Sequence, residues 1–189
     1  MNNEFALERR KVGELNIPNG LVDITDPCYD RSVWCRMNDV KVRPGKYDCF
    51  SFVGEIDDWG PRVWINQIVH QEVDEFDHFR MECIGSIGVD AGLAGFFAKD
   101  KNYSDKEWAD FCSEINRQNK IFRESGDTLY RSYFKIDEDG KSPVGFFTQS
   151  GCGDGGYDVY AAKVGDEIVA LEIRFLSEED FEEIIPEED

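Results

Sequence analysis

The chain has 189 residues, of which 41% are hydrophobic and 14 are Phe, enough for one buried core and evidence against disorder over most of its length. With 40 acidic against 21 basic residues, the formal net charge is −19, which disfavours direct binding to nucleic acid or anionic membrane and favours basic proteins as partners. No apolar run approaches the ~18 residues of a membrane span, and the N-terminal stretch lacks the apolar region of a secretory signal. We therefore expect a cytoplasmic protein, in the host cytoplasm if a phage encodes it, with six reduced cysteines.

Alternation of apolar side chains predicts the first pair of strands. The stretch KYDCFSFVGE at 46–55 has apolar groups on both faces, which is typical of an interior strand. After the loop DDWGP, the stretch RVWINQIVH at 62–70 alternates again. The two segments therefore predict a hairpin.

One amphipathic helix is predicted at 105–119. Ser104 and Glu107 fit a capping box, in which each side chain bonds the backbone N–H of the other residue. An apolar stripe follows at helical spacing: Trp108, Phe111, Cys112 and Ile115. We expect this stripe to pack on the sheet.

Two further hairpins are predicted near the C-terminus. Segments 129–136 and 142–150 flank the turn at 137–140, DEDG, which is too short before its glycine for a calcium loop. Segments 157–164 and 167–175 flank the two-residue turn Gly165-Asp166. Because these connections are too short for helical crossovers, the sheet is expected to be mostly antiparallel.

The predicted fold class is α+β and mainly β: an antiparallel sheet or sandwich built of hairpins, with one amphipathic helix packed on it. We expect residues 1–176 to form a single domain. Residues 177–189, SEEDFEEIIPEED, are rich in acidic groups and contain no basic residue. They form either an acidic tail or a short helix over about 178–185.

Three motifs carry the remaining signal: ITDPCYD at 24–30, GVDAGLAGFF at 88–97 and GFFTQSGCGDGGYDVYAAK at 145–163. Together they resemble an uncharacterised family of bacterial and phage proteins that carry a domain of unknown function, marked by DPCY, Asp-Ala/Ser-Gly and Gly-x-Gly-Asp-Gly-x-Tyr-x-Val-Tyr motifs. The resemblance covers about residues 21–175. It implies a single mainly β domain in a bacterial or phage setting and supplies no activity. Position 152 is more often aromatic in that family, so the departure at Cys152 argues against a catalytic thiol there.

The stretch SGCGDGGY at 150–157 has three interpretations: a phosphate loop, a metal or catalytic loop, or a turn. A phosphate loop presents backbone N–H groups at a helix N-terminus, whereas this stretch leads into a predicted strand. Asp154 and Asp158 would also repel an anion. We predict a glycine-permitted turn in which Asp154 accepts local backbone hydrogen bonds. Any further function of the stretch is expected to reside in Asp154, beside Tyr157.

Carboxylates and histidines are the candidate metal ligands of this sequence. Hard cations such as Mg²⁺ or Ca²⁺ prefer oxygen ligands, and four aspartates in or directly beside the three motifs are candidates: Asp23, Asp26, Asp90 and Asp154. His70 and His78, in HQEVDEFDH, match no common spacing of transition-metal ligands. For these histidines we predict an exposed acidic loop.

Cys28 is the one candidate nucleophile, because it could pair with His70 or His78. Neighbouring carboxylates raise the pKa of a thiol and suppress the reactive thiolate. We therefore predict that Cys28 is a buried packing residue in a proline turn.

Two classes of function follow. The first is a non-enzymatic interaction protein, such as a phage inhibitor of a host enzyme or a bacterial immunity protein, which occupies a basic, perhaps nucleic-acid-binding, site on a partner and uses no cofactor. The second is a binder of a small ligand or nucleotide-like signal, or a hydrolase assisted by a divalent metal. Its site would lie where the three motifs meet and would use Asp26, Cys28, Tyr29, Asp90, Asp154 and Tyr157.

Overall fold

The computed structural model describes residues 7–56, 60–73, 79–98, 132–137 and 139–177, together with residues 106, 109–110, 113–114 and 117. Within these residues the chain forms eleven strands. They are β1 (Glu8–Ile17), β2 (Leu21–Thr25), β3 (Met37–Lys41), β4 (Gly45–Ile56), β5 (Gly60–His70), β6 (Glu82–Val89), β7 (Leu93–Ala98), β8 (Ser132–Ile136), β9 (Pro143–Gln149), β10 (Gly155–Val164) and β11 (Glu167–Arg174).

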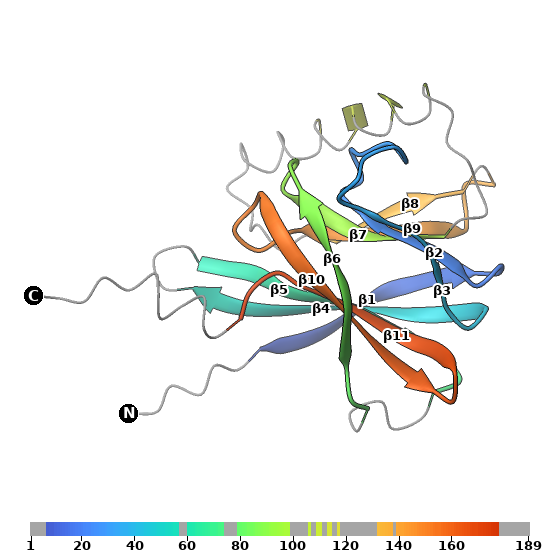
Figure 1. The fold of residues 1–189 in the computed structure, drawn as a ribbon. Coiled ribbons are helices and arrows are strands. Elements are labelled where there is room, and N and C mark those ends of the chain that lie inside the picture. Colours follow the sequence, from blue (N-terminus) through green and yellow to red (C-terminus); the bar gives the residue numbers. More distant parts are fainter. Residues whose placement is uncertain are drawn as a thin grey trace, which may run out of the picture.

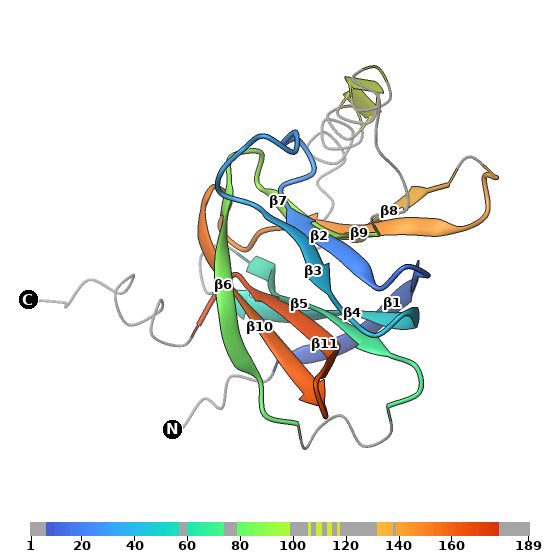
Figure 2. The ribbon, with the colours of Figure 1, turned by 45° about the vertical axis from the view of Figure 1, so that its right-hand side comes forward.

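The strands form two antiparallel sheets that face each other (Figures 1 and 2). Sheet A has six strands in the order β1-β4-β5-β11-β10-β6, and sheet B has five in the order β3-β2-β7-β9-β8. Every pair of neighbours is antiparallel. The predicted antiparallel, mainly β architecture is confirmed, and of the two forms expected it is the sandwich.

The three predicted hairpins are confirmed as β4–β5, β8–β9 and β10–β11. In the β8–β9 turn, the Gly140 N–H donates to the Asp137 carbonyl at 2.9 Å. The Asp139 carboxylate accepts hydrogen bonds from its own turn, one of them from the Lys141 N–H at 2.8 Å. In the β10–β11 turn, Gly165 has a φ of 62°, a conformation that glycine adopts without strain. The short turn signals therefore predicted local pairing correctly.

The two sheets share one apolar core between their inner faces. Phe96 of β7 and Phe146 of β9 lie in it with 0% exposure. A second cluster lies on the outer face of sheet B and contains Leu93, Phe97, Tyr133 and Phe147. Adjacent residues of one strand thus serve opposite faces, as the two-residue period of a strand requires.

A polar bridge crosses the core and joins the two sheets. Asn66 of β5 is fully buried, and its Nδ2 donates to the Ala94 carbonyl of β7 at 3.2 Å and to the Thr148 Oγ1 of β9 at 2.7 Å. Its Oδ1 accepts from the Ser51 hydroxyl at 3.3 Å. Both ends of the amide therefore have partners, as a buried polar group requires.

We expect Asn66→Ala to lower the free energy of unfolding by about 2–4 kcal/mol, because it opens a small cavity and leaves buried acceptors on sheet B without a donor. Urea denaturation followed by circular dichroism measures the change. Ser51→Ala is the control, since it removes only the long contacts at the edge of the bridge. An effect of Asn66→Ala no larger than that of Ser51→Ala would show that the bridge does not hold the sheets.

The packed helix predicted at 105–119 is not supported. Its apolar stripe, Trp108, Phe111, Cys112 and Ile115, lies outside the described residues. The described residues of this segment have helical backbone and exposed side chains, and Glu114 and Arg117 among them form an ion pair. A capping box and a periodic stripe report local helix preference, whereas docking on a sheet depends on contacts distant in sequence. The described fold is therefore mainly β rather than α+β.

The predicted division into a domain at 1–176 and an acidic segment at 177–189 stays a prediction, because 178–189 lie outside the described residues. Likewise, a helix long and apolar enough to cross a membrane is not found in the part of the chain that the structure describes.

Candidate functional site

The three sequence motifs meet at one end of the sandwich. The carboxylate of Asp26, just after β2, accepts hydrogen bonds on its Oδ2 from the N–H groups of Asp90, at 3.0 Å, and Ala91, at 2.7 Å, in the β6–β7 turn. The Gly92 carbonyl of that turn accepts from the Ser150 N–H at 3.1 Å. Figure 2 shows the β2–β3 loop beside the β6–β7 turn. We call residues 26–36, 90–92 and 150–154 together the three-loop end.

Asp26 holds two of these loops together. It is 0% exposed, and its Oδ1 accepts a third backbone hydrogen bond, from the Cys28 N–H at 2.8 Å. Three backbone donors thus share one carboxylate, which accounts for its burial. Because Asp26 has no exposed surface, a ligand or metal could reach its carboxylate only if the loops around it opened.

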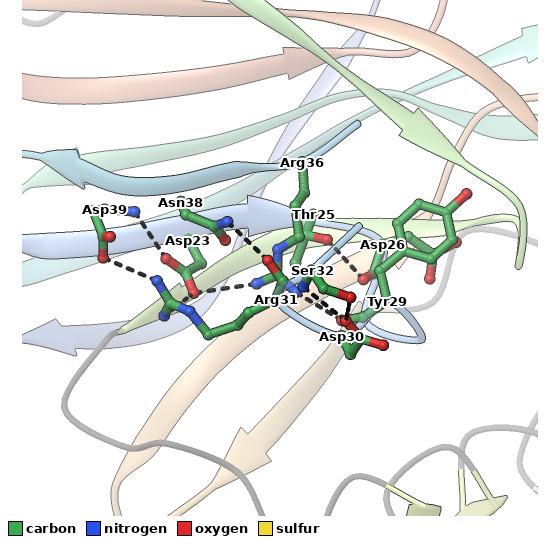
Figure 3. Close-up of polar contacts among 10 residues, drawn as sticks. All are labelled: Asp23, Thr25, Asp26, Tyr29, Asp30, Arg31, Ser32, Arg36, Asn38 and Asp39. Atoms are coloured by element: carbon green, nitrogen blue, oxygen red, sulfur yellow. Dashed lines mark hydrogen bonds and ion pairs between the residues drawn. The ribbon is translucent and has the colours of Figure 1, made fainter. Parts of the chain in front are cut away.

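Asp23, also a predicted metal ligand, is engaged by two arginines (Figure 3). Its Oδ2 accepts from Arg31 Nη1 at 2.8 Å and from Arg36 Nη2 at 3.1 Å, and its Oδ1 accepts from the Asp39 N–H at 2.9 Å. Asp39 has a φ of 61°, so this hydrogen bond stabilises a backbone conformation that is uncommon outside glycine. Two guanidinium groups on one carboxylate leave it poorly suited to a cation.

The loop 26–36 is braced along its length. The buried guanidinium of Arg36 donates from Nη1 to the Tyr29 carbonyl at 2.7 Å. Burial lowers the pKa of Arg36, and the Asp23 carboxylate opposes that shift. Asp30 accepts from the Ser32 N–H at 2.7 Å, and Ser32 lowers the pKa of the Asp30 carboxyl. Contacts thus fix both the interior and the start of the loop.

The same loop rests against β6. The Cys35 carbonyl accepts from the Gly88 N–H at 2.7 Å. A Cβ placed on Gly88 would lie 2.8 Å from the Cys35 Sγ, so the close approach depends on glycine at 88. This contact places the end of the loop beside Gly88, which precedes Asp90 by two residues in the sequence.

The tip of the loop presents Trp34, which is 92% exposed. The other exposed large hydrophobic residues of the described part, Ile136 and Val164, are 43% and 39% exposed. Tryptophan is highly buried on average in folded proteins, so an indole left almost wholly in water on a braced loop calls for an explanation. The sequence interpretation missed Trp34; its only signal is an aromatic residue outside any apolar period, in DRSVWCR.

Cys28 and Tyr29, two of the predicted site residues, do not form a nucleophile and its base. Cys28 is half-buried rather than buried as predicted. Desolvation raises the pKa of Tyr29 to about 12, and Cys35, Asp26 and Asp90 add to the shift. Tyr29 is therefore protonated at neutral pH and can donate a hydrogen bond but cannot act as a base.

The glycine stretch at 150–157 folds as the predicted turn. Gly151 has a φ of 53°, and the Gly153 N–H donates to the Ser150 carbonyl at 2.8 Å. The Tyr157 hydroxyl lies 2.6 Å from the Gly153 carbonyl oxygen and closes the turn, while its ring packs edge-on against Phe175. Tyr157 thus serves the turn itself, which leads into strand β10 and not into a helix.

Asp90 and Asp154 are the two predicted site residues whose carboxylates face solvent. Neither carboxylate accepts a hydrogen bond from the described residues, so the local backbone bonds expected for Asp154 are not made. Among the residues that the structure describes, no three His, Cys, Asp or Glu side chains are grouped to hold a metal ion. The exposed pair is therefore available to a partner in solution.

His70 corrects a sequence interpretation. It was predicted on an exposed acidic loop, but it ends β5 and is 3% exposed. Its Nδ1 accepts from the Glu72 N–H at 3.2 Å, which leaves Nε2 to donate to the Pro44 carbonyl at 3.1 Å. The predicted strand 62–70 thus ends at the expected residue, but its last side chain is buried with backbone partners on both ring nitrogens. His78 lies outside the described residues.

Among the described residues, the three-loop end therefore combines buried carboxylates that hold loops, exposed carboxylates that accept no hydrogen bond, and the exposed indole of Trp34. The family resemblance of its motifs stays a prediction. Comparisons with protein-family models, with curated proteins and with solved structures found no match to this chain, so its function has to be inferred from these loops.

Proposed function

We propose that this chain is a non-enzymatic interaction protein that uses the three-loop end to occupy a basic site on a partner protein. The observation that carries the proposal is the division among the four candidate aspartates. Asp23 and Asp26 are buried and hold the loops, whereas Asp90 and Asp154 face solvent on the same end. In a chain of net charge −19, this division presents negative charge on a fixed frame.

The chemical groups at this end support binding rather than catalysis. Tyr29 is protonated at neutral pH and is therefore not poised to act as a general base. The imidazole of His70 has both nitrogens engaged by backbone groups and lies at the other end of sheet A, where β5 ends beside Tyr47 of β4. No nucleophile and base are thus poised together among these residues.

The expected partner is a bacterial or host protein with a surface of Arg and Lys side chains, such as a site that otherwise binds nucleic acid. Complementary charge accelerates encounter and selects against acidic competitors. A phage inhibitor of a host enzyme or a bacterial immunity protein would work in this way, in the cytoplasm of the cell that contains the partner.

Location-matched charge reversal tests the proposal. The variant Asp90→Lys with Asp154→Lys reverses charge at the three-loop end, and the control Glu82→Lys with Asp166→Lys makes the same change in net charge on exposed residues toward the other end of β10. We expect the wild type and the control to retain a basic protein from bacterial lysate at about 50 mM salt and to release it at about 500 mM. The reversal at the three-loop end should abolish retention.

Equal retention by both reversed variants would show that this end is not the binding surface. Retention unaffected by salt would show that charge does not carry the interaction. Circular dichroism of all variants confirms that each remains folded.

The meeting of the three loops favours one second candidate, a small-ligand or nucleotide-signal binder or a hydrolase assisted by a divalent metal. Asp90 and Asp154 would contact the ligand or metal there, with Tyr29 as a donor. Calorimetry with Mg²⁺ and with mononucleotides separates the candidates, because this one requires binding that Asp90→Ala and Asp154→Ala abolish in a folded protein.

A further inference from the structure

Trp34 stands apart from every other aromatic residue of the described chain because 92% of its surface is exposed. An exposed indole is a large apolar area with a hydrogen-bond donor at one edge. Tryptophan side chains of this kind are enriched among the residues that dominate protein–protein binding. Trp34 is thus a candidate anchor.

The loop below Trp34 is already ordered. Two buried carboxylates hold it, Asp26 at its start and Asp23 through Arg31 and Arg36 (Figure 3). The Val33 N–H donates to the Asp30 carbonyl at 3.2 Å immediately before the tip. An anchor on such a loop loses little conformational entropy when it binds, which favours affinity.

The surroundings of Trp34 define the chemistry of its partner. The bond between the Cys35 carbonyl and Gly88 places the tip beside the end of β6, next to the exposed Asp90. Arg31 and Arg36, the cations of the loop, are balanced by ion pairs with Asp23 and Asp39, which leaves the exposed carboxylates of Asp30 and Asp90 as the net charge. The face around the indole is therefore acidic, and it complements Arg and Lys side chains, which also stack favourably on an indole.

We propose that Trp34 is the binding anchor of the three-loop end and inserts into an apolar pocket that Arg and Lys side chains surround on a partner protein. This inference rests on the proposed function and names the part of the surface that determines affinity. The carboxylates then govern the rate of encounter and its salt dependence, while Trp34 governs the lifetime of the complex.

The test uses the basic protein that the wild-type chain retains from bacterial lysate, purified after identification. Trp34→Ala should weaken its affinity by about 30-fold or more, the loss typical of an interface hot spot. The slope of affinity against salt should stay unchanged, because no charge is lost. The affinity of Trp34→Phe should lie between those of the wild type and Trp34→Ala. Val164→Ala, an exposed apolar control at the far end of β10, should bind with the affinity of the wild type.

Several outcomes separate this inference from the proposed function. If Asp90→Lys with Asp154→Lys abolishes binding but Trp34→Ala changes affinity by less than about threefold, the anchor is refuted and the acidic interaction stands. If the wild type retains no basic protein, both are refuted. Two further outcomes would overturn the anchor. In the first, a benzophenone amino acid at position 34 cross-links to a second copy of this chain. In the second, the wild type binds anionic vesicles and Trp34→Ala abolishes that binding. Because the side chain is exposed, the midpoint of thermal unfolding of Trp34→Ala should equal that of the wild type.

Discussion

Replacing Asp23 with alanine is expected to lower the free energy of unfolding by about 3–5 kcal/mol, the usual result of removing one partner from a buried ion pair. The variant leaves the guanidinium of Arg36 buried, with a side chain that is only 5% exposed and an Nε that has no hydrogen-bond partner. It also removes the acceptor that stabilises the backbone of Asp39. Urea denaturation at neutral pH measures the loss.

Asp39→Asn is the matched control for this prediction. It removes an exposed ion pair with Arg31, and asparagine tolerates the positive φ at 39, so the change should be within about 1 kcal/mol. The double variant Asp23→Ala with Arg36→Met should recover much of the loss, because no charge then stays buried. If Asp23→Ala is as stable as Asp39→Asn, the network in Figure 3 does not hold the loop.

Asp26→Ala is expected to lower the free energy of unfolding by at least about 3 kcal/mol, because the N–H groups of Cys28, Asp90 and Ala91 lose a shared acceptor. These three amides should also exchange with solvent faster than in the wild type. Hydrogen exchange followed by nuclear magnetic resonance reports each of them separately.

Asp90→Ala is the comparison for Asp26→Ala. It alters the neighbouring motif at an exposed carboxylate and should change stability by less than about 0.5 kcal/mol. Unchanged exchange at Asp90 and Ala91 in the Asp26→Ala variant would mean that water replaces the carboxylate without opening the turn. The structural role assigned to Asp26 would then be wrong.

Local patterns predicted the hairpins because period and turn residues lie within a few positions of each other. The β4–β5, β8–β9 and β10–β11 pairs all belong to this class. Strand β1 escaped prediction because its sequence, ERRKVGELNI, is charged, as an edge strand allows. Strand β7, LAGFFA, is buried on both faces and shows no alternation. The pairings β1–β4, β2–β7 and β6–β10 join distant segments and leave no local signal.

The candidate site was predictable in place but not in detail. The sequence pointed to the DPCY, VDAG and GDGGY loops, and these loops meet. It could not show that Asp26 is structural and Asp154 exposed, because burial and hydrogen bonding distinguish these residues and composition does not. The role of Asp23 depends on Arg31 and Arg36, which no motif included. Whether any of these residues contacts a ligand stays a prediction.

The order of strands in sheet A determines when the chain can fold during synthesis. β10 and β11 are made after every other described strand, yet they lie between β5 and β6. Until they emerge, β6 has no neighbour in its sheet and β5 has one open edge. Sheets with such non-local pairing fold slowly and expose unpaired, aggregation-prone strand edges until folding is complete. We therefore expect a nascent chain that stalls before Gly155 to expose β5 and β6 to pairing with other chains.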